Sequence, residues 1–240
     1  MDSLIKRNKI RKQLSTSSKL ASIRINIILI DASLFVNKNN GKKELLTEEK
    51  VLERDMKLID SDEFRPDIIH NSLLMLLDSP LCKSGCLSDI LILNLDGKLI
   101  RVSPKFRVPR SFKVFSKVFS EFLSSPNGEL KLPDEENTVL ISLLNSSIEE
   151  YLSNSEVVVG LSRMAKKVSL QEFCRNEIAT KIRNGADNIN FVIGASATNN
   201  SCGQFTSKFT HYISLSDVSM PSYICCTKIC SEMEELLGIY

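Results

Sequence analysis

One uninterrupted apolar run near the start of the chain constrains the fold most. Residues 24–31 read R-I-N-I-I-L-I-D, with isoleucine or leucine at five of the eight positions. A strand with one face in water alternates apolar and polar residues, whereas a parallel strand covered on both faces is almost continuously apolar. The run therefore predicts a buried strand in a parallel sheet that has helices on both faces.

The rest of the chain alternates between strand-like and helix-like patterns. Apolar runs occur at residues 139–144, 156–162, 191–196 and 212–216, and helical patterns occur around 170–182 and 221–237. Such alternation implies an α/β fold, and we expect residues 23–240 to form a single domain. Residues 1–22 carry six basic residues and one acidic residue, which predicts a basic, disordered arm. Contact with nucleic acid and a plain solvated tail both remain open for this arm.

The glycines and histidines exclude several enzyme classes. No two of the nine glycines lie closer than nine residues apart. This spacing excludes the glycine-rich loops of dinucleotide-binding folds and P-loop NTPases, and also the G-x-S-x-G nucleophile elbow. The two histidines, His70 and His211, lie outside any H-E-x-x-H motif and are too few for a multi-histidine zinc site. We therefore expect no metal cofactor.

The seven cysteines indicate reduced thiols. Their number is odd and no secretory signal precedes them, which favours the cytoplasm or nucleus. The C-C-x-x-x-C pattern at 225–230 lacks the C-x-x-C pairs of structural zinc sites. Cys226, Cys230, Met233 and Leu237 instead recur at helical spacing, which predicts buried thiols. The aliphatic runs at 27–30 and 73–77 are far short of the roughly 18 residues that cross a membrane, so we expect no membrane partner.

Positive charge is concentrated in one stretch. Between Asp96 and Glu121 there is no acidic residue, but there are seven basic ones: Lys98, Arg101, Lys105, Arg107, Arg110, Lys113 and Lys117. Alternating residues around Asp96-Gly97 predict a β-hairpin, and phenylalanines at 112, 115, 119 and 122 predict a helix with an apolar stripe. Arg110, Lys113 and Lys117 form a cationic stripe on the other face. The missing acids favour a nucleic-acid surface over an ordinary solvated face.

A second helix and two loops carry further candidates for a site. Residues 66–77 predict a helix with an early proline and a carboxylate, Asp67, in its first turn, where both are favoured. Asp78 at its other end is either a turn residue before Pro80 or a second catalytic candidate. The small-residue loops at 194–197 and 214–216 follow predicted strands, where α/β sheets bind ligands such as adenosine.

Two motifs carry a family resemblance. Residues 65–85, R-P-D-I-I-H-N-S-L-L-M-L-L-D-S-P-L-C-K-S-G, closely resemble the signature of the eukaryotic and archaeal small-subunit rRNA pseudouridine N1-methyltransferases, which belong to the SPOUT class. Residues 107–113, R-V-P-R-S-F-K, resemble their second signature. The resemblance implies a SPOUT-type α/β fold with a C-terminal trefoil knot, and a homodimer. It also implies methyl transfer from S-adenosylmethionine to N1 of a pseudouridine in small-subunit rRNA.

The resemblance also implies roles for particular residues. Arg65 and Asp67 would contact the RNA and its target base, and Arg107 and Arg110 would bind RNA, with Lys113 replacing a basic residue that the family has at position 114. Asp67 is the first candidate for the carboxylate that accepts the N1 proton, and Asp78 is the second. The implied cofactor residues are Leu161, Gly194, Ala195, Asn199, Ile213, Ser214, Leu215, Ser216, Asp217 and Val218.

The implied biological setting is ribosome assembly. The resemblance places the protein in the nucleus, at the nucleolus, with ribosome-assembly proteins as partners. The chain departs from the family pattern at Cys82, which replaces an asparagine, at Asn199, which replaces a glycine, and at V-S-M-P (218–221), which replaces Y-P-L-S. These departures leave one alternative: an rRNA-binding assembly factor of the same fold that has lost methyl transfer.

Overall fold

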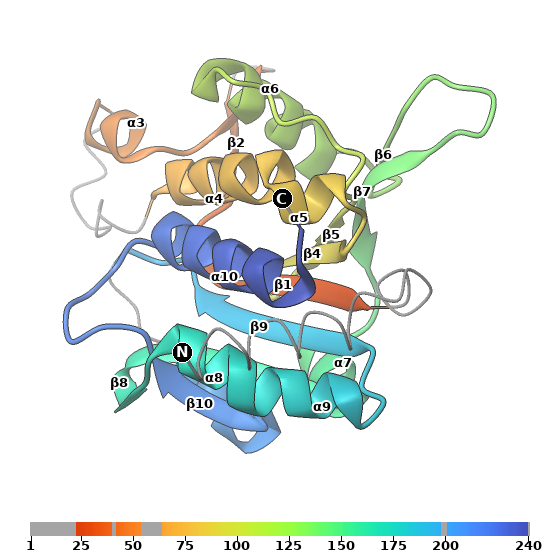
Figure 1. Cartoon of the computed structure of the whole chain (residues 1–240). Coiled ribbons are helices and arrows are strands. Elements are labelled where there is room, and N and C mark those ends of the chain that lie inside the picture. Colours follow the sequence, from red (N-terminus) through yellow and green to blue (C-terminus); the bar gives the residue numbers. More distant parts are fainter. Residues whose placement is uncertain (1–22, 40–41, 54–63, 198–200, 240) are drawn as a thin grey trace.

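The computed structural model describes residues 23–39, 42–53, 64–197 and 201–239, so the predicted N-terminal arm lies outside the described residues. Its centre is an eight-stranded sheet in the order β10-β8-β9-β1-β4-β5-β7-β6 (Figure 1). The strands are β1 (Arg24–Ala32), β4 (Leu87–Asn94), β5 (Leu99–Val102), β6 (Glu129–Lys131), β7 (Val139–Leu144), β8 (Val157–Lys167), β9 (Asn188–Gly194) and β10 (His211–Ser214).

The sheet has a parallel half and an antiparallel half. The strands β10, β8, β9, β1 and β4 run parallel, as the apolar run at 24–31 predicts. The sheet is mostly rather than entirely parallel, because β5, β7 and β6 continue it in antiparallel orientation. The cause is local: the Asp96-Gly97 turn joins β4 directly to β5, and a short turn can join only antiparallel strands. Gly97 has φ +78°, and the predicted hairpin is confirmed.

Helices cover both faces of the sheet. They are α4 (Pro66–Asp78), α5 (Pro80–Lys83), α6 (Phe112–Leu123), α7 (Ile148–Ser153), α8 (Leu170–Phe173), α9 (Ala179–Arg183) and α10 (Ser222–Leu237), with a π-helical turn, Cys174–Ile178, between α8 and α9 and a 3-10 helix, Ser201–Lys208. In Figure 1, α4 and α10 lie side by side in front of the sheet.

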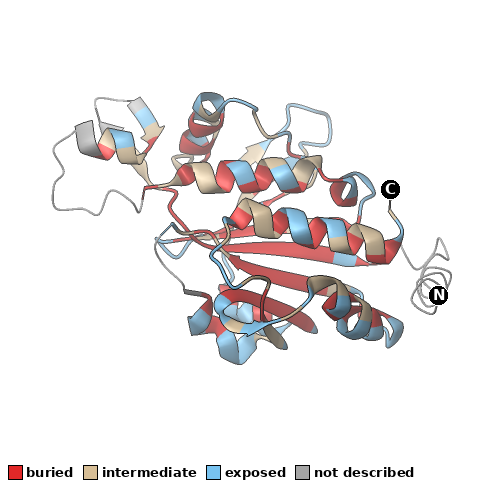
Figure 2. Cartoon of the chain, turned by 60° about the vertical axis from the view of Figure 1, so that its left-hand side comes forward, coloured by how far each residue is buried: buried red, intermediate tan, exposed pale blue. Residues whose placement is uncertain are grey.

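Strand β1 shows why both faces must be covered. Ile25, Ile27 and Leu29 belong to the larger core cluster, which α4, α6 and α10 share. Ile28 and Ile30, which point to the other face, belong to a smaller cluster with α7 and the 3-10 helix. Each of these five side chains is fully buried, and Figure 2 shows the buried residues along the strands and the inner sides of the helices. The continuous apolar run thus fills two cores at once.

One segment differs from its expected structure. No pattern in the sequence predicts strands here, but β2 (Val36–Asn39) and β3 (Lys42–Leu45) form an antiparallel pair before the short helix α3 (Glu48–Glu53). Residues 40–41 and 54–63 lie outside the described residues. The strands are rich in lysine and asparagine, so they show no apolar alternation that sequence reasoning can detect. Ser120 of α6 donates a hydrogen bond to the Lys43 carbonyl (3.1 Å), which helps to hold the pair.

The last helix confirms the predicted buried thiols. Cys226, Cys230, Met233 and Leu237 of α10 are all less than 4% exposed. Burial raises the pKa of Cys230 to about 12 and that of Cys226 well above its ordinary value, so both thiols remain protonated near neutral pH. No helix in the described part of the chain is long and apolar enough to span a bilayer.

Candidate functional site

A cleft lies at the carboxyl ends of the parallel strands. Its volume is about 830 Å³, which is within the usual range for a small-molecule site. Five separate segments line it: the start of α4, the middle of β8, the end of β9 with its loop, the start of the 3-10 helix, and the loop from β10 together with the first turn of α10. The lining residues are Arg65, Asp67, Ile68, Asn71, Leu161, Ser162, Arg163, Ile193, Gly194, Ser196, Ala197, Cys202, Ser214, Leu215, Ser216, Val218, Ser219, Met220, Pro221, Ser222, Tyr223 and Cys225.

A break in strand register brings β8 into the cleft. Gly160 of β8 pairs with Tyr212 of β10, but the next β10 residue, Ile213, pairs with Lys166. Residues 161–165 therefore have no partner in β10 and form a long bulge. Within the bulge the Ser162 hydroxyl accepts a hydrogen bond from the Met164 amide (3.2 Å). Bulges re-aim side chains at sheet ends, and this one turns residues 161–163 toward the cleft.

Serine hydroxyls shape the two loops that follow β9 and β10. Ser214 donates to the carbonyl of Ser216 (2.8 Å), and the hydroxyl of Ser216 accepts from the amide of Val218 (3.1 Å). Ser222, the first residue of α10, donates to the carbonyl of Gly194 at the end of β9 (2.5 Å). These hydrogen bonds fix both loops. Because the side chains that form them are small, the loop backbone lies close to the cleft.

The start of α4 supplies the charged groups. The Arg65 amide donates to the buried hydroxyl of Ser33, just after β1 (2.7 Å). The Arg65 guanidinium donates two hydrogen bonds to the Asp67 carboxylate, each 2.8 Å, and both side chains remain about 40% exposed. The carboxylate also lies in the first turn of α4, where the helix dipole favours it. The cleft therefore contains an oriented, accessible carboxylate.

The structure gathers six of the ten implied cofactor residues in the cleft, namely Leu161, Gly194, Ser214, Leu215, Ser216 and Val218. Ala195 and Ile213 are buried and do not line it. Asp217 also does not line the cleft, and its carboxylate pairs with Lys167. Asn199 lies outside the described residues. Sequence reasoning did not identify Asn71, although a residue four positions after Asp67 on a helix shares its face. It also did not identify Arg163.

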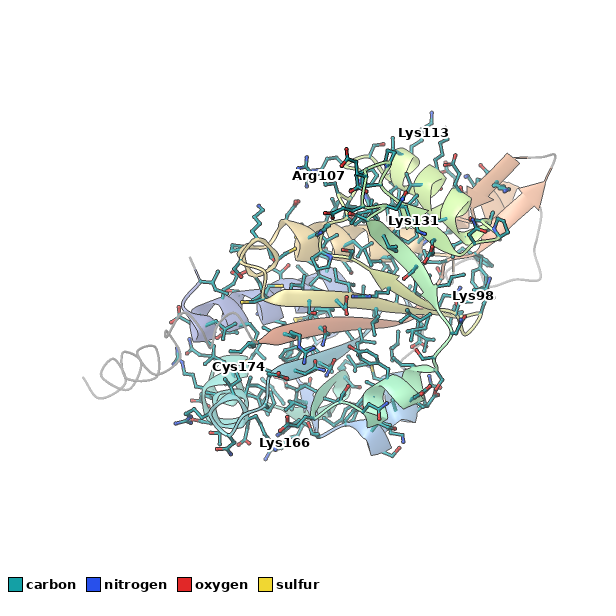
Figure 3. The ribbon with its side chains drawn as sticks, turned by 90° about the vertical axis from the view of Figure 1, so that its right-hand side faces the viewer. Lys98, Arg107, Lys113, Lys131, Lys166 and Cys174 are labelled. Atoms are coloured by element: carbon teal, nitrogen blue, oxygen red, sulfur yellow. The ribbon has the colours of Figure 1, made fainter. Side chains whose placement is uncertain are left out.

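The cationic stretch divides into separate groups. Figure 3 shows Arg107 and Lys113 near α6, whereas Lys98 lies apart from them, at the β4–β5 turn. Arg101 pairs with Asp89 of β4 (2.7 Å). We call the remaining exposed group the cationic surface. It consists of Lys105, Arg107, Arg110, Lys113 and Lys117.

The loop before α6 is fixed to α4. The buried His70 side chain hydrogen-bonds through Nε2 to the carbonyl of Pro109 (2.8 Å), and its ring contacts that of Phe115 in a tilted arrangement, with centroids 4.6 Å apart. Asp78 pairs with Arg110 through both carboxylate oxygens. Asp78 is therefore not part of the cleft: it lies eleven residues along α4 from Asp67, which is roughly 16 Å at 1.5 Å per residue. The structure brings Asp67 to the cleft and Asp78 to the cationic surface.

The described residues offer no obvious metal centre, because they contain no cluster of three or more histidine, cysteine or acidic side chains that could hold an ion. The two candidate regions are thus a small-molecule cleft with a carboxylate and a separate cationic surface. The helix α4 connects them.

Comparison with known proteins gives consistent results. The family model described as EMG1/NEP1 methyltransferase matches residues 27–234. A relative from Candida albicans, named ribosomal RNA small subunit methyltransferase NEP1, is 33% identical over 183 residues, which are 75% of this chain and 64% of the relative. The human protein of the same name is 28% identical over 232 residues, which are 95% of this chain and 88% of the relative.

A solved structure has the same fold. The crystal structure of Archaeoglobus fulgidus Nep1 bound to S-adenosylhomocysteine superposes with a TM-score of 0.70 at 20% sequence identity, and the match covers 89% of this chain and 98% of the archaeal one. The family model spans most of the chain, including the start of α4, the β8 bulge and both loops of the cleft. The chain therefore belongs to the EMG1/NEP1 methyltransferase family.

Proposed function

We propose that this protein transfers a methyl group from S-adenosylmethionine to N1 of a pseudouridine in small-subunit rRNA during ribosome assembly. One observation carries the proposal: a single cleft combines the loops after β9 and β10 with the Arg65–Asp67 pair at the start of α4. The relatives named rRNA methyltransferases support it.

The cleft fits a methyl donor that contains adenosine. Glycine, alanine and serine line much of it, so a ligand can reach backbone groups. Gly194, Leu161, the residues of the 214–216 loop and Val218 would hold the cofactor, and the archaeal structural relative is bound to S-adenosylhomocysteine. When bound, the cofactor supplies an electrophilic methyl group on a sulfonium sulfur. The protein then needs only to align the acceptor nitrogen and remove its proton.

Asp67 is suited to that proton transfer. Its two hydrogen bonds with Arg65 use part of its capacity, since an ionised carboxylate has about four acceptor positions. It can therefore still accept the N1–H of a base placed in the cleft, while Arg65 holds it in one orientation. Such a base must be splayed out of a single-stranded RNA loop.

The cationic surface would bind the RNA backbone. Arg107 is exposed, and planar guanidinium groups bind phosphates through two hydrogen bonds. The contacts of α4 with Pro109 and Arg110 keep this surface in a fixed position relative to Asp67. RNA held there would present its target base to the cleft at the other end of α4.

The proposal includes the finer features of the SPOUT class: a trefoil knot in the C-terminal part and a homodimer. The outward side of the α4–α10 pair contains exposed and half-buried residues (Figure 2), and Met75 of α4 is 41% exposed. A second copy would cover this side. Light scattering should give about twice 26.9 kDa, whereas a monomer at every concentration would contradict the dimer.

An rRNA substrate also places the protein in the nucleus, at the nucleolus, among ribosome-assembly proteins. Microscopy of a fluorescent fusion beside a nucleolar marker tests this placement. A fusion that stays outside the nucleus would contradict it.

The decisive test is radiolabelled methyl transfer to an rRNA hairpin that contains pseudouridine, compared with its uridine twin. The proposal requires labelling of the pseudouridine hairpin alone, because uridine has a glycosidic bond at N1. If the protein binds the hairpin but not millimolar S-adenosylmethionine, it is the assembly factor without catalysis. Replacing Asn199 with glycine and residues 219–221 with P-L-S should then restore cofactor binding.

A further inference from the structure

The β8 bulge carries a cation whose role the proposed function leaves open. Arg163 lines the cleft and its side chain is exposed. The other arginine that lines the cleft, Arg65, is paired with Asp67. Arg163 forms no ion pair with any residue that the structure describes. The cleft therefore has one positive charge that no neighbouring carboxylate balances.

The bulge holds Arg163 at this position. The slip in register between β8 and β10 releases residues 161–165 from strand pairing. The Met164 amide donates a hydrogen bond to the Ser162 hydroxyl. Residues 162–164 therefore form a tight turn with Arg163 at its centre. A regular strand would keep this residue in the ladder with β10, so the bulge is what makes Arg163 part of the cleft wall.

We propose that Arg163 binds the carboxylate of the amino-acid portion of S-adenosylmethionine. This inference rests on the proposed function. The cofactor carries one anionic group, the carboxylate, and it also carries positive charge on its sulfonium and ammonium groups. The carboxylate and the ammonium share the α-carbon at one end of the ligand. Arg163 offers a cation for that carboxylate and lines the same cleft as Asp67, which the proposed function uses for the acceptor base. A guanidinium can bind a carboxylate through two parallel hydrogen bonds.

Two ligands that differ only in the carboxylate provide the test. Calorimetry would measure binding of S-adenosylmethionine and of its decarboxylated form to the full chain. We expect the wild type to prefer the intact cofactor by roughly tenfold, the strength of a hydrogen-bonded charged pair. Arg163→Gln should reduce that preference to nearly one, by weakening only the intact cofactor. Arg163→Lys should keep part of the preference, because it keeps the charge.

Lys166→Gln is the matched control. Lys166 lies on the same strand and is exposed, but it does not line the cleft; Figure 3 shows where it lies at the surface. Its replacement removes the same charge from the chain and should leave the preference unchanged. If Lys166→Gln lowers the preference as much as Arg163→Gln, the effect is general electrostatics and the inference is overturned.

The remaining outcomes separate this inference from the proposed function. If the wild type binds neither ligand, the proposed cofactor is wrong and the inference falls with it. If the wild type binds both ligands and Arg163→Gln does not change their ratio, only the inference is overturned. If in that case the variant binds the rRNA hairpin more weakly, Arg163 contacts RNA phosphate instead.

Discussion

The cleft and the cationic surface are built in opposite ways. The cleft takes its lining from segments that begin at Arg65 and end at Cys225, so it exists only when the strands β8, β9 and β10 pair correctly and the helices α4 and α10 pack beside them. The cationic surface comes from one stretch, residues 105–117, and needs little more than a loop and a helix with its phenylalanines buried. Substitutions in the cleft should therefore affect catalysis and cofactor binding, whereas substitutions on the cationic surface should affect RNA affinity. The helix α4 connects the two sites.

The largest expected effect is at the carboxylate in the cleft. Asp67→Asn keeps the size of the side chain and removes the proton acceptor, so kcat should fall by about a hundredfold or more while RNA affinity stays nearly constant. Single-turnover methyl transfer and hairpin binding measure the two quantities. Asp187→Asn is the control. It also removes a carboxylate that pairs with an arginine, Arg24, but this pair lies outside the cleft. A loss of less than threefold would remove Asp67 from the mechanism.

The next effect concerns cofactor entry. A Cβ added at Gly194 would meet only the Cys202 sulfur, at 3.9 Å, so Gly194→Val should fold and direct its methyl groups into the cleft. We expect cofactor affinity to fall by about thirtyfold, because the ligand loses space, and hairpin affinity to stay unchanged. Calorimetry measures the first and fluorescence anisotropy the second. Gly203→Val, at an open position outside the cleft, should bind the cofactor normally; equal loss in both variants would contradict the cleft.

A smaller effect is expected at the cationic surface. Replacing Arg107 and Arg110 with alanine should weaken hairpin binding by about tenfold or more and reduce the salt dependence of log Kd by about one unit for each lost phosphate contact. Cofactor affinity and thermal stability should barely change.

Lys98→Ala sharpens this prediction. Lys98 belongs to the same cationic stretch of the sequence but lies apart from the surface (Figure 3). The Lys98→Ala variant should therefore leave the salt dependence of hairpin binding unchanged. If Lys98→Ala reduces the salt dependence as much per lost charge as the double replacement of Arg107 and Arg110, total charge matters more than the folded surface.

The smallest effect tests the connection through α4. Asp78→Asn removes the carboxylate that pairs with Arg110. The freed guanidinium can bind phosphate, so hairpin affinity should rise, but by no more than about threefold, in line with the modest value of an exposed ion pair. At saturating RNA, kcat should be unchanged. A large loss of kcat would instead support Asp78 as a catalytic carboxylate.

Much of the fold could be predicted because its signals are local. The continuous apolar run of β1, the Asp96-Gly97 hairpin and the phenylalanine stripe of α6 each depend on neighbours within a few residues. The β2–β3 pair was missed because strands without alternation carry no periodic signal. The antiparallel pairing of β7 with β5 and β6 was not predicted, since strand order beyond a hairpin depends on long-range pairing.

The sequence by itself determined the α/β class, the cationic stretch and the motif that contains Arg65 and Asp67. Only the tertiary structure decided which of those residues act together. It separated Asp67 from Asp78 along one helix, paired Asp217 with Lys167 outside the cleft, and separated Lys98 from Arg107. It also placed Arg163 in the cleft through a slip in register between β8 and β10. The physical reason is that a strand's register and a helix's packing are set by partners far away in the chain, whereas apolar periodicity and charge are properties of the local sequence.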